Sequence, residues 1–235
     1  MRRIGGSLVV AVALGAALTL SALPASAGRA APATGVLLST IQQRAATSIS
    51  LRRTTIEQLE SLVAGTRSFA GDDGSMLAGR LRSDAAGLAA LGSKVASDQD
   101  ARTAWADYVA VFDQYRIYAL VDPVVHFVRA TDVLVVLVTP RLVTVQRTLR
   151  SLLRQEQRAG KNVSAATKPM KDLGAQLHTI SSMTDGLSAR LLALTPADWN
   201  ADHAVLGPPL TDLQKARVAV GRAVADAQAV EVVLQ

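Results

Sequence analysis

Apolar residues recur every three or four positions along the chain after residue 35, and this spacing places them on one face of an α-helix. The longest regular repeat runs from Val163 to Leu194 and holds one polar residue, Thr184. Two charged residues, Arg52 and Asp84, also fall at apolar positions of their repeats. Two further repeats predict an aromatic stripe of Trp105, Tyr108, Phe112 and Tyr115, and an apolar stripe of Val138, Leu142, Val145, Leu149 and Leu152. Val133–Val138 has the β-branched composition of a strand, but its helical flanks lead us to interpret it as a buried turn of helix. The pattern therefore predicts helices and no β-sheet.

Glycine and proline residues divide this helical pattern into segments. The expected breaks lie at the turn Gly71–Gly74 and at Gly160, whereas Pro123 is expected to stop or kink its helix and Pro140 to kink the next one. Long helices joined by short loops pack antiparallel, so we predict an all-α fold, an elongated up-down antiparallel bundle of four to five long helices. The alternative is a coiled-coil oligomer, in which residues 163–194 pair between chains and the protein self-associates.

The N-terminal residues have the pattern of a secretory signal peptide. Arg2 and Arg3 precede an apolar stretch, Leu8–Leu20. Ala25 and Ala27 then provide the small side chains that a signal peptidase reads. We expect cleavage after Ala27.

This reading divides the chain into a signal peptide (1–27), a flexible leader (28–35) and a helical-bundle domain (36–235). The expected location is extracellular or in the cell envelope, and the excess of Ala, Val and Arg over Ile and Lys favours a bacterial source with a high-GC genome. An uncleaved anchor is the alternative, since residues 4–23 approach the length of about 20 residues that spans a bilayer.

The composition excludes several kinds of chemistry. The chain has no cysteine, which rules out disulfides, thiolate metal sites and a cysteine nucleophile. It has three histidines, and no hydrolase triad, HExxH pair or phosphate loop is recognisable, so we expect no metal, no cofactor and no enzymatic activity. We also expect no transmembrane helix after the signal peptide, because charged side chains interrupt the most apolar later window, 124–143.

Aromatic and polar side chains gather around Pro123. Six of the eight aromatic residues lie between Trp105 and Phe127. A helix would place Asp122, His126 and Arg129 on one face, with Asp132 one further turn along. The candidate ligand cluster comprises Tyr115, Arg116, Tyr118, Asp122, His126, Arg129 and Asp132. It predicts either a small polar pocket at a kink or, as we favour, paired polar groups that fix the register of the bundle.

A second candidate is a basic helix face. Between Arg141 and Lys171 there are eight basic residues and one acidic residue, Glu156. Its core is a stripe of arginines spaced three, four and four residues apart: Arg147, Arg150, Arg154 and Arg158. Such a stripe attracts anionic lipid headgroups or phosphate-bearing wall polymers. The alternative is a solvated face whose charges pair with a neighbouring helix.

Two segments carry a resemblance to known proteins. They are Tyr115-Arg116-Ile117-Tyr118-Ala119-Leu120-Val121-Asp122-Pro123, followed by His126, and Leu194-Thr195-Pro196-Ala197-Asp198-Trp199-Asn200-Ala201-Asp202-His203-Ala204-Val205-Leu206. With the signal peptide and the intervening helix, they resemble a group of uncharacterised secreted helical proteins of high-GC and related bacteria. The resemblance covers most of residues 75–235 and implies an exported helical bundle, without an activity, cofactor or catalytic residue. Asp122 departs from the small or apolar residue expected before the proline.

The sequence thus favours a non-enzymatic secreted or envelope-associated protein that binds a partner, such as another envelope protein, or an anionic surface polymer or lipid through the basic face. The alternative is a small-ligand binder or an enzyme that uses the cluster near Pro123. Nucleic acid is not an expected partner, because the protein is expected to be exported and no aromatic residues interleave with the arginines.

Overall fold

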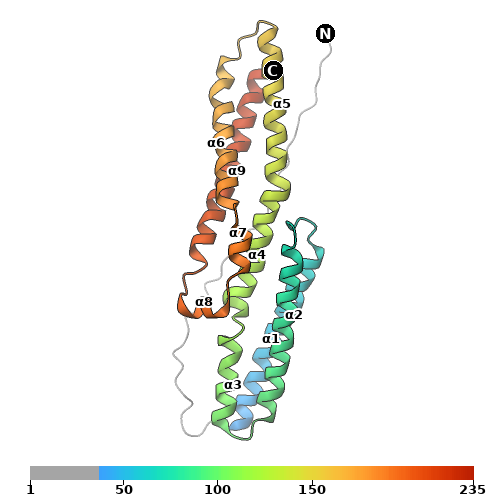
Figure 1. Ribbon diagram of the computed structural model, residues 1–235, viewed down its shortest axis with the longest axis vertical. Coiled ribbons are helices and arrows are strands. Elements are labelled where there is room, and N and C mark those ends of the chain that lie inside the picture. Colours follow the sequence, from blue (N-terminus) through green and yellow to red (C-terminus); the bar gives the residue numbers. More distant parts are fainter. Residues whose placement is uncertain (1–36) are drawn as a thin grey trace. The chain divides into compact units, whose positions relative to one another are not determined.

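The computed structural model describes residues 37–235, and all regular elements in this part of the chain are helices (Figure 1). The predicted all-α fold is confirmed. The expected signal peptide and leader lie outside the described residues. The α-helices are α1 (Leu38–Gly65), α2 (Asp73–Ser97), α3 (Ala101–Asp113), α4 (Asp122–Asp132), α5 (Thr139–Arg158), α6 (Thr167–Thr184), α7 (Leu187–Leu192), α8 (Pro196–Ala201) and α9 (Gly207–Leu234).

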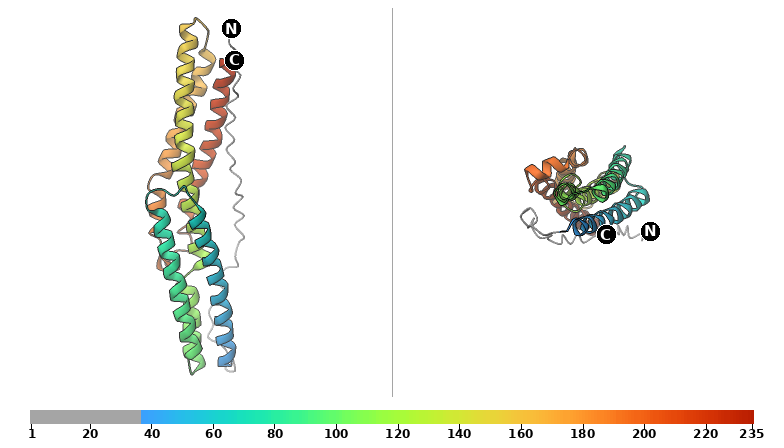
Figure 2. Two further views of the ribbon diagram at one scale, coloured as in Figure 1. Left: turned by 90° about the vertical axis from the view of Figure 1, so that its right-hand side faces the viewer. Right: turned by 90° about the horizontal axis from the view of Figure 1, so that it is seen from below.

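The long helices form two groups. Helices α1, α2 and α3 pack against one another, and α5, α6 and α9 form the other group, in which α6 and α9 are the most extensively paired helices. A continuous helix that contains α4 and α5 passes from the first group into the second (Figure 2). The short α7 packs against α4 beside this helix. The bundle is therefore organised around one shared helix rather than as a single set of parallel rods.

The shared helix accommodates two prolines because it is locally π-helical just before each of them. Its segments Ile117–Val121 and Val133–Val138 are π-helical, and Pro123 and Pro140 each lie just beyond one of them. A proline lacks an N–H, and its ring crowds the carbonyl four residues earlier. In a π-helix each N–H donates to the carbonyl five residues earlier, and this wider turn relieves that crowding. The helix consequently continues through both prolines, whereas the sequence predicted a stop or a kink at the first.

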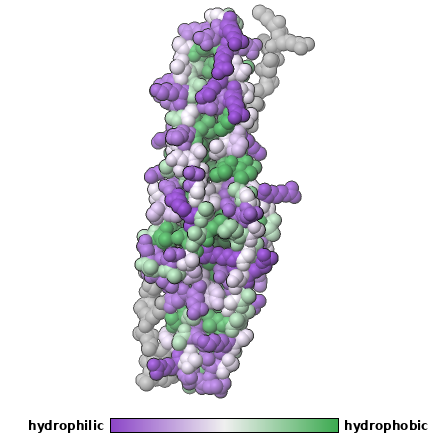
Figure 3. All heavy atoms as spheres, viewed as in Figure 1, coloured by the Kyte–Doolittle hydropathy of each residue, from purple (hydrophilic) through white to green (hydrophobic). Residues whose placement is uncertain are grey.

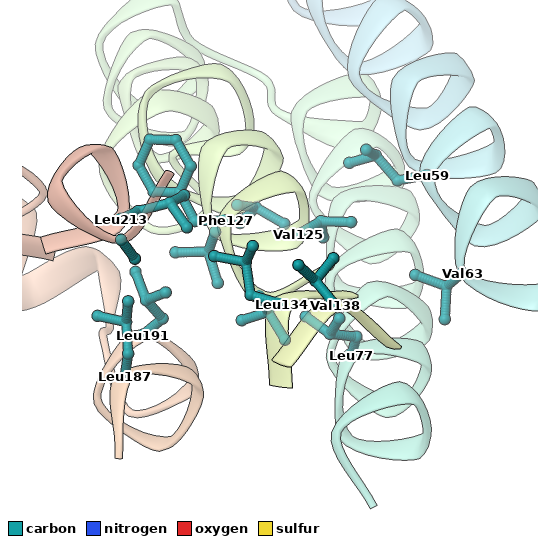
Figure 4. Close-up of a cluster of buried hydrophobic side chains, with 14 of the residues drawn as sticks. Leu59, Val63, Leu77, Val125, Phe127, Leu134, Val138, Leu187, Leu191 and Leu213 are labelled. Carbon is teal, nitrogen blue, oxygen red and sulfur yellow. The ribbon is translucent and has the colours of Figure 1, made fainter. Parts of the chain in front are cut away.

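Apolar side chains fill the space between the helices, while the outward faces are mostly hydrophilic with narrow apolar patches (Figure 3). Figure 4 shows the core where the shared helix meets its neighbours. There Leu134 of the second π-helical segment lies among Leu77 of α2, Leu187 and Leu191 of α7, and Leu213 of α9. All five side chains are at most 2% exposed. This core therefore ties the two groups of helices together.

The long repeat at residues 163–194 is not one helix. Gly186 adopts a left-handed conformation (φ 61°), which a residue without a Cβ reaches at little cost, and it separates α6 from α7. The polar member of the repeat, Thr184, is buried and donates its hydroxyl hydrogen to the carbonyl of Ile180. The apolar stripe of α6 is covered by α9 of the same chain. No second chain is needed to bury it.

The apolar faces predicted for α5 and α3 are not the faces that the structure buries. Leu152, assigned to the buried stripe of α5, is 42% exposed, and the buried positions of α5 are Leu142, Gln146 and Leu149. The aromatic residues of α3 form a half-buried flank, while its buried positions are Ala104, Asp107 and Val111.

Candidate functional site

The residues predicted to cluster near Pro123 are separated by the fold. Arg116, which has a left-handed backbone, donates through Nε to Asn200 of α8 and through Nη2 to Asp113. The ring of Tyr118 lies 5.0 Å from the Arg52 guanidinium of α1. Each of these side chains therefore contacts a different helix.

The remaining members also have separate neighbours. His126 lies 3.3 Å from Asp122, and both side chains are more than one-third exposed. The Nε of Arg129 is buried without a hydrogen-bond partner in the described part of the chain. Tyr115 packs its hydroxyl end against Gly87 of α2. The contacts of the seven residues are thus spread over several helices, apart from the pair of Asp122 and His126.

Asp132 is the most buried member of this group, at 1% exposure. Its two carboxylate oxygens accept separate hydrogen bonds, one from the Ala70 N–H (3.1 Å) and one from the Ser188 hydroxyl (2.7 Å). Burial raises the pKa of Asp132 to about 6, although both hydrogen bonds lower it and the nearby Asp73 raises it. Asp132 thus joins α4 to the loop between α1 and α2 and to α7.

A second carboxyl with a raised pKa lies in α2 and is half-buried. Asp84, which the pattern placed at an apolar position, has its pKa raised to about 6 by burial, while the neighbouring Arg80 opposes that shift. Burial and the Asp84 charge also raise the pKa of Tyr115. The Nη1 atom of Arg80 and the Oδ2 atom of Asp84 are buried without hydrogen-bond partners among residues 37–235. All three side chains of this group, Arg80, Asp84 and Tyr115, are half-buried.

The basic face keeps the arrangement predicted from its spacing. Arg147, Arg150, Arg154 and Arg158 are all exposed on α5. Within residues 37–235 none of them lies within 4.0 Å of a carboxylate, whereas Lys161 pairs with Glu156 and Lys168 pairs with Asp172, each at 2.6 Å. The arginines therefore retain uncompensated charge.

The basic face borders helix α6. A Cβ placed on Gly174 of α6 would lie 3.2 Å from Nε2 of Gln146 and 4.0 Å from Nη2 of Arg150. Gly174 thus leaves room for the α5 side chains at this contact. Lys171, one turn before Gly174, is exposed as well. The positive surface therefore begins on α5 and continues toward α6.

The sequence did not predict a pocket that lies on the group of helices formed by α1, α2 and α3. Between α1 and α3 there is a pocket of about 290 Å³, lined by Gln43, Arg44, Thr47, Ser48 and Tyr108. The sequence signal was Arg52 at an apolar position of α1, one turn beyond Ser48. The sequence did not indicate which helix would pack against Arg52.

No grouping of three or more His, Asp or Glu side chains within residues 37–235 is suited to hold a metal ion. The helices of this region also include none with the length and apolar character needed to cross a membrane. No family model, curated protein or solved structure matches the chain.

Proposed function

We propose that the chain is an exported, non-enzymatic protein that binds an anionic, phosphate-bearing surface of the cell envelope through the basic face of α5. The observation that carries the proposal is the row of four exposed arginines without carboxylate partners in the described region. An anionic surface attracts each such basic residue by about 1 kcal/mol at moderate ionic strength. Each of the four arginines alone would bind such a surface weakly, whereas the four together would bind it appreciably.

The alternative use of the cluster near Pro123 has less support. A ligand site needs polar groups that point into a shared cavity. Here Arg116 is engaged by Asp113 and Asn200, and Asp132 is engaged by Ala70 and Ser188. These contacts favour the interpretation that the cluster holds helices together.

The surface-binding proposal is tested by sedimentation with isolated envelopes and with vesicles that contain phosphatidylglycerol. We expect the wild-type protein to pellet at low salt and to be released as salt rises, because screening weakens exposed charges. Replacing all four arginines of the stripe with glutamine should weaken binding at least tenfold. Binding to envelopes alone would identify a wall polymer, and binding to both would identify lipid phosphate.

A charge-matched control separates the stripe from the net charge of the protein. It replaces four exposed arginines from scattered positions: Arg53, Arg82, Arg102 and Arg222. This control should bind nearly as well as the wild type. Equal losses in both variants would contradict a role for the stripe, as would a failure of the wild-type protein to pellet at any salt concentration.

Export is a separate part of the proposal, and its basis is the sequence pattern before Gly28. Expression of the full chain in a high-GC bacterium should yield a mature protein that begins at Gly28, because Ala25 and Ala27 supply the small residues of the cleavage site. Intact-mass measurement of the culture medium and envelope fractions checks this. Recovery of the uncleaved chain in membranes would instead identify an anchor.

A further inference from the structure

The pocket between α1 and α3 lies beside a buried cation. Arg52 is 8% exposed, and its Nη1 donates to the carbonyl of Ser48 (2.9 Å). Its guanidinium carbon lies 4.4 Å from the ring centre of Phe112 and 5.0 Å from that of Tyr118. Among residues 37–235, no carboxylate lies within 4.0 Å of it. The aromatic faces offset part of the cost of burying this charge.

Tyr108 connects this cation to the pocket. The Tyr108 ring lines the pocket and also meets the Phe112 ring edge-on at 5.2 Å. Burial lowers the pKa of Arg52, whereas Tyr118 and Tyr108 raise it, so both phenols lie near the guanidinium. On its other side Tyr108 contacts Trp105 at 5.6 Å. Tyr108, with Phe112 and the Arg52 charge near it, therefore forms one side of the pocket.

The other side supplies hydrogen-bond donors. Thr47 uses its hydroxyl hydrogen on the carbonyl of Gln43 (3.0 Å). The side chains of Gln43, Arg44 and Ser48 have no hydrogen-bond partner in the described part of the chain, and no carboxylate lines the pocket. Arg44 is exposed and lies two turns before Arg52 on the same helix. The pocket thus combines positive charge and free donors with no acidic group to satisfy them.

We propose that this pocket binds a small organic anion, a carboxylate carried on a flat apolar body. The carboxylate would accept hydrogen bonds from Arg44, Ser48 and Gln43, and the flat body would pack against the Tyr108 ring. The pocket is open to solvent and its volume of about 290 Å³ is small, which suits a single-ring ligand bound at the surface. The site involves other helices than the basic face and does not depend on the proposed function.

Benzoate is the probe that tests the site, and benzamide is its uncharged counterpart of nearly equal shape. Titration of the isotopically labelled protein by NMR should give saturable shifts at the amides of Thr47, Ser48 and Tyr108 with benzoate. Benzamide should give at most weak, non-saturating shifts, because it lacks the charge that Arg44 and Arg52 attract. Equal binding of the two probes would overturn the proposal, and so would the absence of saturable benzoate shifts at these residues.

Substitutions locate the interaction. Arg44→Gln should weaken benzoate binding about tenfold, the effect of losing one hydrogen bond between charged groups. Because Arg44 is exposed, this variant is expected to keep the fold, and its circular dichroism spectrum and melting curve verify that. Arg53→Gln, an exposed arginine on a different face of α1, is the matched control and should bind as the wild type does. Equal affinity of the wild type and Arg44→Gln would overturn the assigned pocket.

Discussion

Leu134→Ala is expected to lower the free energy of unfolding by about 3 kcal/mol, within the range that buried leucine-to-alanine substitutions produce. Leu134 is 2% exposed and lies among apolar side chains from α2, α7 and α9. Truncation removes apolar contacts and leaves a cavity, which a well-packed interior closes only in part. Urea unfolding followed by circular dichroism at 222 nm measures the loss.

Leu137→Ala provides the control on the same π-helical segment. Leu137 is 38% exposed, so its truncation removes fewer contacts and leaves no enclosed cavity. We expect a loss of less than about 1 kcal/mol for this variant. If the two substitutions destabilised the protein equally, the core around Leu134 would not join the helix groups as described.

The helices were predictable because burial on a helix repeats with the period of the backbone. The stripe of α1 from Ile41 to Val63 follows that period, and Arg52 is buried within it as its position indicated. Asp100 caps α3, accepting the N–H groups of Arg102 and Thr103. These features depend on residues within a few positions of one another, which the sequence displays directly.

The partners of the polar side chains were not predictable in the same way. Asp122 and His126 are four residues apart and do share a face, where they pair. Asp132 follows His126 by six residues, and at about 100° per residue this step carries it to another side of the helix. There it is buried against Ser188 and Ala70, which a pattern within one helix cannot identify. The break at Gly186 was also missed, since the apolar spacing continues through the turn.

The pocket at Tyr108 illustrates the same limit. Its residues come from α1 and α3, which are separated in sequence by the whole of α2. The aromatic pattern of α3 predicted a buried stripe, yet those rings form a half-buried flank because Ala104 and Val111 face the core instead. Long-range packing decides which of two neighbouring faces of a helix is covered.

Asp132→Asn is expected to stabilise the protein at pH 8 by on the order of 2 kcal/mol and to reduce the dependence of its stability on pH. Burial raises the pKa of Asp132 to about 6 in the folded protein, from 3.8 for an unperturbed carboxyl. The folded state therefore binds the proton more tightly than the unfolded state does. The stabilising contribution of the protonated carboxyl is complete below pH 3.8 and is lost as the pH rises through about 6.

Asparagine matches the protonated carboxyl in shape and charge. Its Oδ1 can accept the Ala70 N–H, and its Nδ2 can donate to the Ser188 oxygen, so both contacts of Asp132 can be kept. The two proteins should consequently have similar stability near pH 4 and diverge as the pH rises. Burial also raises the pKa of Asp84 to about 6. The stability of the variant should therefore still fall with rising pH, but less than that of the wild type.

Urea unfolding of both proteins at intervals from pH 4 to pH 8 measures this divergence. Asp185→Asn, at an exposed position just after α6, is the control and should change stability by less than about 0.5 kcal/mol at any of these pH values. A lower stability of Asp132→Asn at pH 8 would contradict the prediction. It would mean that the hydrogen bonds from Ala70 and Ser188 to the ionised carboxylate outweigh the cost of removing its charge from water.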